Sequence, residues 1–276
     1  MNRTHYLLAS ILLFTLAPLA AVANPGALEI NQDCAAVGCF AGDAPGYPVE
    51  ITQPGSYILT SDLTNPGIGV NAISVSTTRV DIDLNGHTID GGGTCSGSPV
   101  TACSGFAGMR AINISTSGPA LAHIHNGSIR GFSDGAIVIF AADDGTLLEH
   151  LSVSQNGYGT LIVGNLASST VRIRDSQFVR NLNSGITIAN NGCQLLVENT
   201  SIVGNKSYGL ILGSGGVAVG NRIGSNGQVG LLCSGTCALG QNTFVGNNAA
   251  AAQFTVTALS NMGGNVCLDH ANSVCP

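Results

Sequence analysis

Short apolar segments recur along most of this chain, and polar segments rich in Asn and Gly separate them. The stretch LLVENTSIVGNKSYGLILGS, residues 195–214, is typical, with Asn199 and Asn205 between its apolar runs. These runs are too short for helices, and flanking Asn and Gly residues are typical of strands that end in turns. We therefore predict an all-β protein.

The strand-like segments repeat at a nearly constant interval. A Gly precedes successive segments at positions 135, 159, 185, 209 and 230, so the steps are 24, 26, 24 and 21 residues. A second strand-like segment follows each one and ends at an Asn: Asn156, Asn181, Asn205, Asn226 and Asn247. Leucine-rich repeats have similar lengths, but their Leu spacing and helical return are missing here. The period therefore predicts a solenoid, in which stacked repeats share one core.

Stacking brings residues about two dozen positions apart into contact, with neighbouring strands ~4.8 Å apart. Parallel crossovers are almost always right-handed, so we expect a right-handed coil. Asn and Gly tolerate the left-handed backbone that tight corners require. We also expect stacked Asn side chains to hydrogen-bond along a corner column.

Two N-terminal segments extend this picture: PGSYILTSDL, residues 54–63, and AISVSTTRVDIDLNGHTIDG, residues 72–91. Together they resemble the opening coil of secreted bacterial β-helix repeat proteins. From about residue 47 to 266 the chain resembles right-handed parallel β-helix proteins of the pectate-lyase-like superfamily. The resemblance implies a parallel β-helix of about seven or eight coils. It implies no single activity, because that superfamily includes lyases, hydrolases, epimerases and non-enzymes.

The N-terminus has the pattern of a cleavable signal peptide. Arg3 precedes the apolar run Leu7–Leu19, and the small residues 21–23 form a cleavage site. We therefore expect a secreted or periplasmic product. No later segment reaches the ~18 apolar residues of a membrane span. The predicted organisation is a signal peptide at 1–23, an N-terminal cap at 24–70, a β-helix at 71–264 and a disulfide-closed tail at 265–276.

All nine Cys residues follow the signal peptide, and eight of them form close pairs. In a secreted chain this pattern predicts disulfides that close local loops. The expected bonds are Cys34–Cys39, Cys95–Cys103, Cys233–Cys237 and Cys267–Cys275. Cys193 is left over, and we interpret it as a buried thiol, with a reactive thiol as the alternative. The spacings contain no repeated C-x-x-C, so they do not predict a zinc site.

Composition and charge exclude some classes of partner. Without Arg3 the chain keeps eight Lys and Arg residues against fifteen Asp and Glu, a formal charge of 8 − 15 = −7. This balance disfavours nucleic acid, which prefers a basic surface. We expect no cofactor. Calcium is the one cation that a motif suggests, because DIDLNG at residues 81–86 matches half of a calcium loop; Gly92 stands where the loop needs an acid.

One set of positions combines acids, His and Arg. If alternate residues point outward, two neighbouring columns arise on one face of the coil. One column reads Asp83, His123, Leu147, Arg172 and Leu196. The other reads Asn85, His125, Glu149, Arg174 and Glu198. The loop from residue 90 to 109 starts from the coil beside these columns, and we expect it to form one wall of a groove there.

Three interpretations of this face stay open. A polysaccharide lyase needs a base and a cation, for which His123 or His125 and Arg172 or Arg174 are candidates. A glycoside hydrolase needs two carboxylates, and Glu149 and Glu198, two coils apart, are separated by about 9.5 Å of backbone. Asp83 and Asn85 are candidates for substrate binding in either case. The third interpretation is a ladder of ion pairs that only stabilises the sheet.

We therefore expect the protein to engage an extracellular polysaccharide, either with or without cleavage. The alternative is a non-catalytic adhesive or surface-structural module. An apolar outer stripe on another face supports it and suggests self-association. The predicted stripe comprises Val138, Ile162, Thr187, Ile211 and Leu232.

Overall fold

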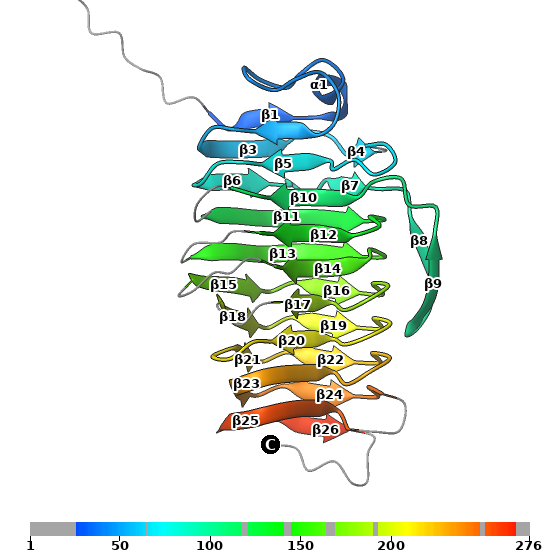
Figure 1. Ribbon diagram of the computed structural model, residues 1–276, viewed down its shortest axis with the longest axis vertical. Helices are drawn as coiled ribbons and strands as arrows, with labels where there is room; N and C mark the ends of the chain where they lie inside the picture. Colours follow the sequence, from blue (N-terminus) through cyan, green and yellow to red (C-terminus); the bar gives the residue numbers. More distant parts are fainter. Residues whose placement is uncertain are drawn as a thin grey trace, which may run out of the picture.

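The computed structural model describes residues 26–64, 66–116, 121–140, 145–163, 169–189, 193–248 and 252–268. The expected signal peptide lies outside these residues. Figure 1 shows one elongated column of stacked coils, with the chain running from one end to the other. It is a right-handed parallel β-helix of about eight coils, as the repeat predicted.

The coils have three faces, each a ladder of parallel strands. Face 1 comprises β1 (Leu28–Ile30), β3 (Gly55–Leu59), β6 (Val80–Asp83), β15 (Ser169–Arg174), β18 (Cys193–Glu198) and β21 (Val217–Val219). Face 2 comprises β4 (Leu63–Thr64), β7 (Thr88–Asp90), β16 (Gln177–Val179), β19 (Ser201–Val203), β22 (Arg222–Gly224), β24 (Thr243–Val245) and β26 (Val266–Leu268). Face 3 comprises β2 (Val49–Ile51), β5 (Ile73–Val75), β10 (Arg110–Ile114), β12 (Gly135–Ile139), β14 (Tyr158–Ile162), β17 (Ile186–Ile188) and β20 (Leu210–Leu212).

Four longer strands cross a corner and belong to two faces. β11 (Ala122–Arg130) and β13 (Thr146–Ser154) run from face 1 into face 2. β23 (Leu231–Gly240) and β25 (Phe254–Gly263) run from face 3 into face 1. Several corners between faces 1 and 2 contain a residue with positive φ, such as Asn126 at 61° and Asn199 at 48°. The predicted role of Asn at the corners is therefore confirmed for Asn199.

Inward side chains stack into a continuous apolar core. On face 1 the register aligns Ile82, Ile124, Leu148, Ile173 and Val197, and all five are fully buried. Each belongs to a strand of only a few residues. A coil alone would leave these side chains open to water above and below, so burial requires the neighbouring coils.

A second interior column consists of amide side chains. The Oδ1 atom of Asn205 accepts from the backbone N–H of Asn181 at 2.9 Å, and the same contact links Asn181 to Asn156 at 3.0 Å. Asn226 and Asn247 continue the column, and all five side chains are almost completely buried. The predicted Asn column is therefore confirmed. The amides hold consecutive coils in register, because each one satisfies buried backbone groups of its neighbour.

The two ends of the column differ. The short helix α1 (Gln32–Ala35) lies above β1 at the N-terminal end (Figure 1). This part of the predicted cap also contains strands that already pair in parallel with the coils. At the C-terminal end Met262, Val266 and Leu268 are 46–50% exposed.

Three of the predicted disulfides are present: Cys34–Cys39, Cys95–Cys103 and Cys233–Cys237. Cys275, the expected partner of Cys267, lies outside the described residues. Cys193 is buried in β18. Within the described part of the chain, no helix is long and apolar enough to cross a membrane.

The loop at residues 90–109 does not form a wall beside the charged columns, and that prediction is wrong. It contains the antiparallel hairpin of β8 (Thr94–Gly97) and β9 (Val100–Ser104), which extends down the column (Figure 1). Arg180 donates to the carbonyl of Cys95 at 3.0 Å, and the N–H of Val100 donates to the carbonyl of Gly204 at 3.0 Å. Because Arg180 and Gly204 directly follow face 2 strands, the hairpin lies against the corner after face 2, away from face 1.

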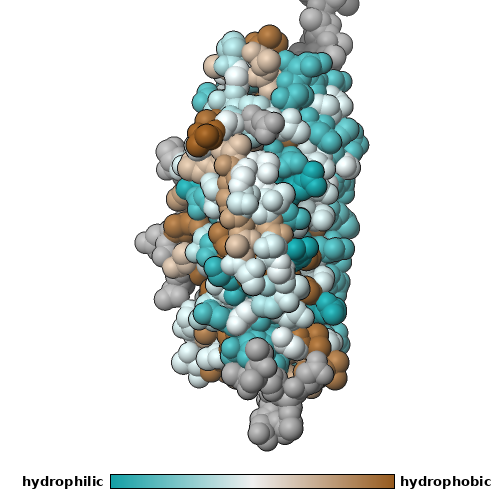
Figure 2. Space-filling model, turned by 90° about the vertical axis from the view of Figure 1, so that its right-hand side faces the viewer, coloured by the Kyte–Doolittle hydropathy of each residue, from teal (hydrophilic) through white to brown (hydrophobic). Residues whose placement is uncertain are grey.

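The apolar stripe on face 3 differs from the prediction at one coil. The register aligns Val138, Leu161, Thr187, Ile211 and Leu232, so the outward member of β14 is Leu161. Ile162 points into the core and is fully buried. The register step from β12 to β14 is 23 residues, so Gly135 aligns with Tyr158 and not with Gly159, and the prediction for this coil is off by one position. Elsewhere, the side of the molecule at the right of Figure 1 shows apolar side chains scattered among polar ones (Figure 2).

Candidate functional site

The outward columns of face 1 run through five neighbouring strands, β6, β11, β13, β15 and β18. One column aligns Asp81, His123, Leu147, Arg172 and Leu196. The other aligns Asp83, His125, Glu149, Arg174 and Glu198. From β11 to β18 this is the predicted arrangement.

The coil of β6, where the charged columns begin, departs from the prediction by two residues. Asp83 lies opposite His125 and not opposite His123, whose partner is Asp81. The corner between faces 1 and 2 is longer in this coil than in the next. It comprises residues 84–87 here, whereas the corner of β11 comprises only residues 126–127. Asn85 lies in that corner at φ 50°, and its side chain donates to the carbonyl of Leu59. Asn85 is therefore not a member of the charged columns.

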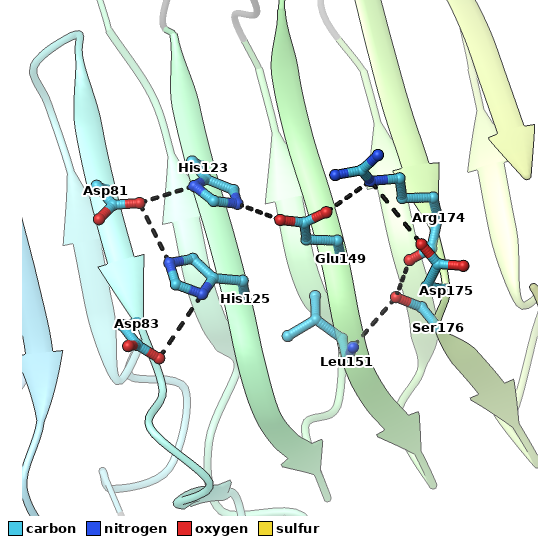
Figure 3. Close-up of polar contacts among 9 residues, drawn as sticks. All are labelled: Asp81, Asp83, His123, His125, Glu149, Leu151, Arg174, Asp175 and Ser176. Atoms are coloured by element: carbon cyan, nitrogen blue, oxygen red, sulfur yellow. Dashed lines mark hydrogen bonds and ion pairs between the residues drawn. The ribbon is translucent and has the colours of Figure 1, made fainter.

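Two His residues and Asp81 meet at the N-terminal end of the columns (Figure 3). The Oδ1 atom of Asp81 lies 2.8 Å from Nδ1 of His123 and 3.2 Å from Nε2 of His125. The two imidazole rings stack with their centroids 4.1 Å apart. This geometry follows from the strands, because His123 and His125 are alternate residues of β11 and both face β6.

Each His ring has a second carboxylate at its other nitrogen. Nε2 of His123 lies 2.9 Å from Oε1 of Glu149, and Nδ1 of His125 lies 3.7 Å from Oδ1 of Asp83. His123 thus bridges two carboxylates. Without a cation in the cluster, both of its contacts are hydrogen bonds only if both ring nitrogens carry protons.

Glu149 is the most buried member of the columns, with 11% of its side chain exposed. Its Oε2 accepts from Nε of Arg174 at 2.6 Å, while Oε1 faces His123 (Figure 3). Burial by itself raises the pKa of Glu149, but the hydrogen bonds and charges of Arg174 and His123 outweigh it and leave the pKa lowered. Glu149 is therefore ionised at neutral pH, which disfavours it as a general acid.

Arg172 and Glu198 form the last ion pair of the columns, with Nε and Oε2 2.7 Å apart. In the following coil the outward positions are Val217 and Val219, which the register places opposite Leu196 and Glu198. The charged columns therefore end at β18. We define the charged face as their ionisable members: Asp81, Asp83, His123, His125, Glu149, Arg172, Arg174 and Glu198.

A pocket of about 490 Å³ opens at the start of β6 and β11, beside Asp81 and His123. Arg79 and Leu147 also line it. Neither Asp81 nor Arg79 is among the site residues predicted from the sequence. For Asp81 a signal was present, because it alternates with Ile82 and Asp83 in a strand. The same strand geometry shows that DIDLNG does not form a calcium loop, since Asp81 and Asp83 belong to β6.

Fold and charged face together define a β-helical repeat protein with a line of paired ionisable side chains on one face. A family model described as a right-handed β-helix region matches residues 55–249. This match covers more than half of the chain, so the protein belongs to the right-handed β-helix family. A search of curated proteins found no match.

Proposed function

We propose that the protein is secreted and binds an extracellular polysaccharide along its charged face, without cleaving it. The observation that carries this proposal is the alignment of hydrogen-bonding side chains on five adjacent strands. Four steps of ~4.8 Å give a length of roughly 19 Å. A straight, regularly spaced row of polar groups suits a repeating polymer better than a compact ligand.

The charges favour one class of polymer. Asp81, Asp83, Glu149 and Glu198 outnumber Arg172 and Arg174, and the whole chain carries a formal charge of −6. A polyanion would meet repulsion on this surface. A neutral, hydroxyl-rich polysaccharide would not, because hydroxyl groups both donate to carboxylates and accept from Arg.

The pairing of the charges supports binding over catalysis. A hydrolase of this design would use Glu149 or Glu198 as a general acid, but both accept from an Arg and the pKa of Glu149 is lowered. A lyase would use His123 or His125 as a base. Both nitrogens of His123 already face carboxylates, so neither is left to take a proton from a substrate.

A binding assay combined with a product assay tests the proposal. The protein is titrated with neutral and uronate-containing polysaccharides, and each mixture is assayed for new reducing ends and unsaturated ends. We expect binding to a neutral polysaccharide without products. Arg172→Ala should weaken it roughly tenfold, because it removes a charge-assisted hydrogen bond of about 1.5 kcal/mol.

Arg222→Ala is the matched control, because Arg222 is exposed on face 2, outside the charged face. Equal losses in the two variants would show that the charged face is not the binding surface. No binding to any polysaccharide would contradict the proposal as a whole. New chain ends in the wild-type mixture would establish an enzyme instead.

A further inference from the structure

Three side chains of the charged face bring metal-ligating donor atoms close together. The Oδ1 of Asp81 and one nitrogen each of His123 and His125 all lie within 4.8 Å of one another. Asp81 comes from β6 and both His residues from β11, so two neighbouring strands fix the arrangement. The donor pairs at 2.8 and 3.2 Å are slightly closer than the ~3.3 Å between ligands that lie ~2.0–2.1 Å from a tetrahedral ion.

Carboxylates lie behind both rings, as they do behind many metal-binding His residues. Glu149 accepts at Nε2 of His123, which leaves Nδ1 to face Asp81. Asp83 faces Nδ1 of His125, which leaves Nε2 toward Asp81. A His that binds a metal almost always donates its other N–H to a carboxylate, a carbonyl or water. In this cluster Glu149 lies 2.9 Å from His123 and Asp83 lies 3.7 Å from His125, so only His123 has the second contact at hydrogen-bond distance.

The net charge of the cluster also favours a bound cation. Asp81, Asp83 and Glu149 contribute three negative charges, and Arg174 offsets one of them. With neutral imidazoles the formal sum is −3 + 1 = −2. A bound divalent cation would neutralise it.

We infer that Asp81, His123 and His125 bind a divalent transition-metal cation of the zinc type. Two of the three donors are imidazole nitrogens, which suit Zn²⁺ and disfavour Ca²⁺, a cation that prefers oxygen ligands. Three protein ligands leave a fourth position for water or a ligand. Two of the three residues, Asp81 and His123, also line the pocket of about 490 Å³. The stacked rings need a small rotation to aim at one ion, and His123, with 35% of its side chain exposed, has room for it.

This inference does not rest on polysaccharide binding, and its test uses the metal alone. The protein is purified without a His tag, with its disulfides intact, and titrated with Zn²⁺ in a calorimeter. We expect one tight site per chain. Asp81→Asn and His125→Ala should each weaken Zn²⁺ binding at least tenfold, and Asp83→Asn should weaken it about tenfold because it loosens His125. Equimolar Ca²⁺ should not displace Zn²⁺.

His87→Ala is the matched control. His87 also faces a carboxylate, with Nδ1 3.2 Å from Oδ1 of Asp62, but among the described residues it belongs to no cluster of three possible metal ligands. Its removal should leave Zn²⁺ binding unchanged. Circular dichroism confirms that each variant is folded, and Asp81→Asn keeps the size of the side chain if a His variant fails. The inference would be overturned if Asp81→Asn bound Zn²⁺ as tightly as the wild type, or if His87→Ala lost as much affinity as the cluster variants. Displacement of Zn²⁺ by Ca²⁺ would overturn it as well.

Discussion

The amide column inside the coils permits a quantitative prediction for Asn205→Ala. The Oδ1 atom of Asn205 accepts from the backbone N–H and the Nδ2 of Asn181, at 2.9 and 3.0 Å. Its Nδ2 donates to the carbonyl of Phe178 at 3.2 Å and to Oδ1 of Asn226 at 2.9 Å. Alanine removes all four contacts in a fully buried position, which water cannot reach.

The expected destabilisation follows from the groups that stay behind. The N–H of Asn181 and the carbonyl of Phe178 lose the partner that Asn205 provides, and an unsatisfied buried group costs about 1–3 kcal/mol. Two such groups give roughly 4 kcal/mol. The measurement is urea unfolding followed by circular dichroism, complemented by hydrogen exchange at the Asn181 amide, since long repeat arrays deviate from two-state unfolding.

Asn199→Ala is the matched control for this prediction. Asn199 lies in the same coil, but it is exposed at a corner with φ 48°. Alanine tolerates this left-handed conformation less well, at a cost of about 1 kcal/mol. If Asn205→Ala were no more destabilising than Asn199→Ala, or if the Asn181 amide kept its protection, the amide column would not hold the coils in register.

Two further predictions concern the charged face and the hairpin. The pKa of Glu149 is lower in the folded protein than its unfolded value, near 4.5. Its ion pair with Arg174 therefore stabilises the fold fully above the unfolded pKa. This stability is lost as pH falls through the folded pKa. Wild type should therefore exceed Glu149→Gln in stability by about 1 kcal/mol at pH 7, since Arg174 is 39% exposed and water screens the pair. Urea unfolding should show the gap closing below pH 4.5; a constant gap would refute the pairing. The double variant Cys95→Ser and Cys103→Ser should make the hairpin sensitive to limited proteolysis while global unfolding stays unchanged, because the hairpin pairs only with itself as a sheet; loss of the whole fold would contradict this.

Most of the fold was predictable because every β-helix coil buries its side chains in the same way. Each unit must bury its alternate residues against the next, so the Gly and Asn positions reveal the period. The inward column from Ile82 to Val197 and the five amides from Asn156 to Asn247 both follow from this rule. Local disulfides were predictable for the same reason, since Cys residues four to eight positions apart close turns.

The errors arise where coil length changes. The longer corner at residues 84–87 shifts Asp83 and Asn85 by two positions relative to β11. The 23-residue step from β12 to β14 shifts Ile162 by one. A shift of one residue turns a side chain from the surface to the core. The hairpin was misplaced for a different reason, because nothing in residues 90–109 specifies the corner on which it packs.

Stability alone does not account for where the charged face lies. Exposed ion pairs on neighbouring strands contribute about 0–1 kcal/mol each, and burying a charge such as Glu149 carries a desolvation cost. A purely stabilising ladder would be as useful at the C-terminal coils. There the same columns continue instead as Val217, Val219, Ala238 and Gly240. The core and the amide column already hold these coils without outward charges. The acids, His and Arg of the N-terminal half are therefore better explained by a ligand or cation that they bind than by the stacking of the coils.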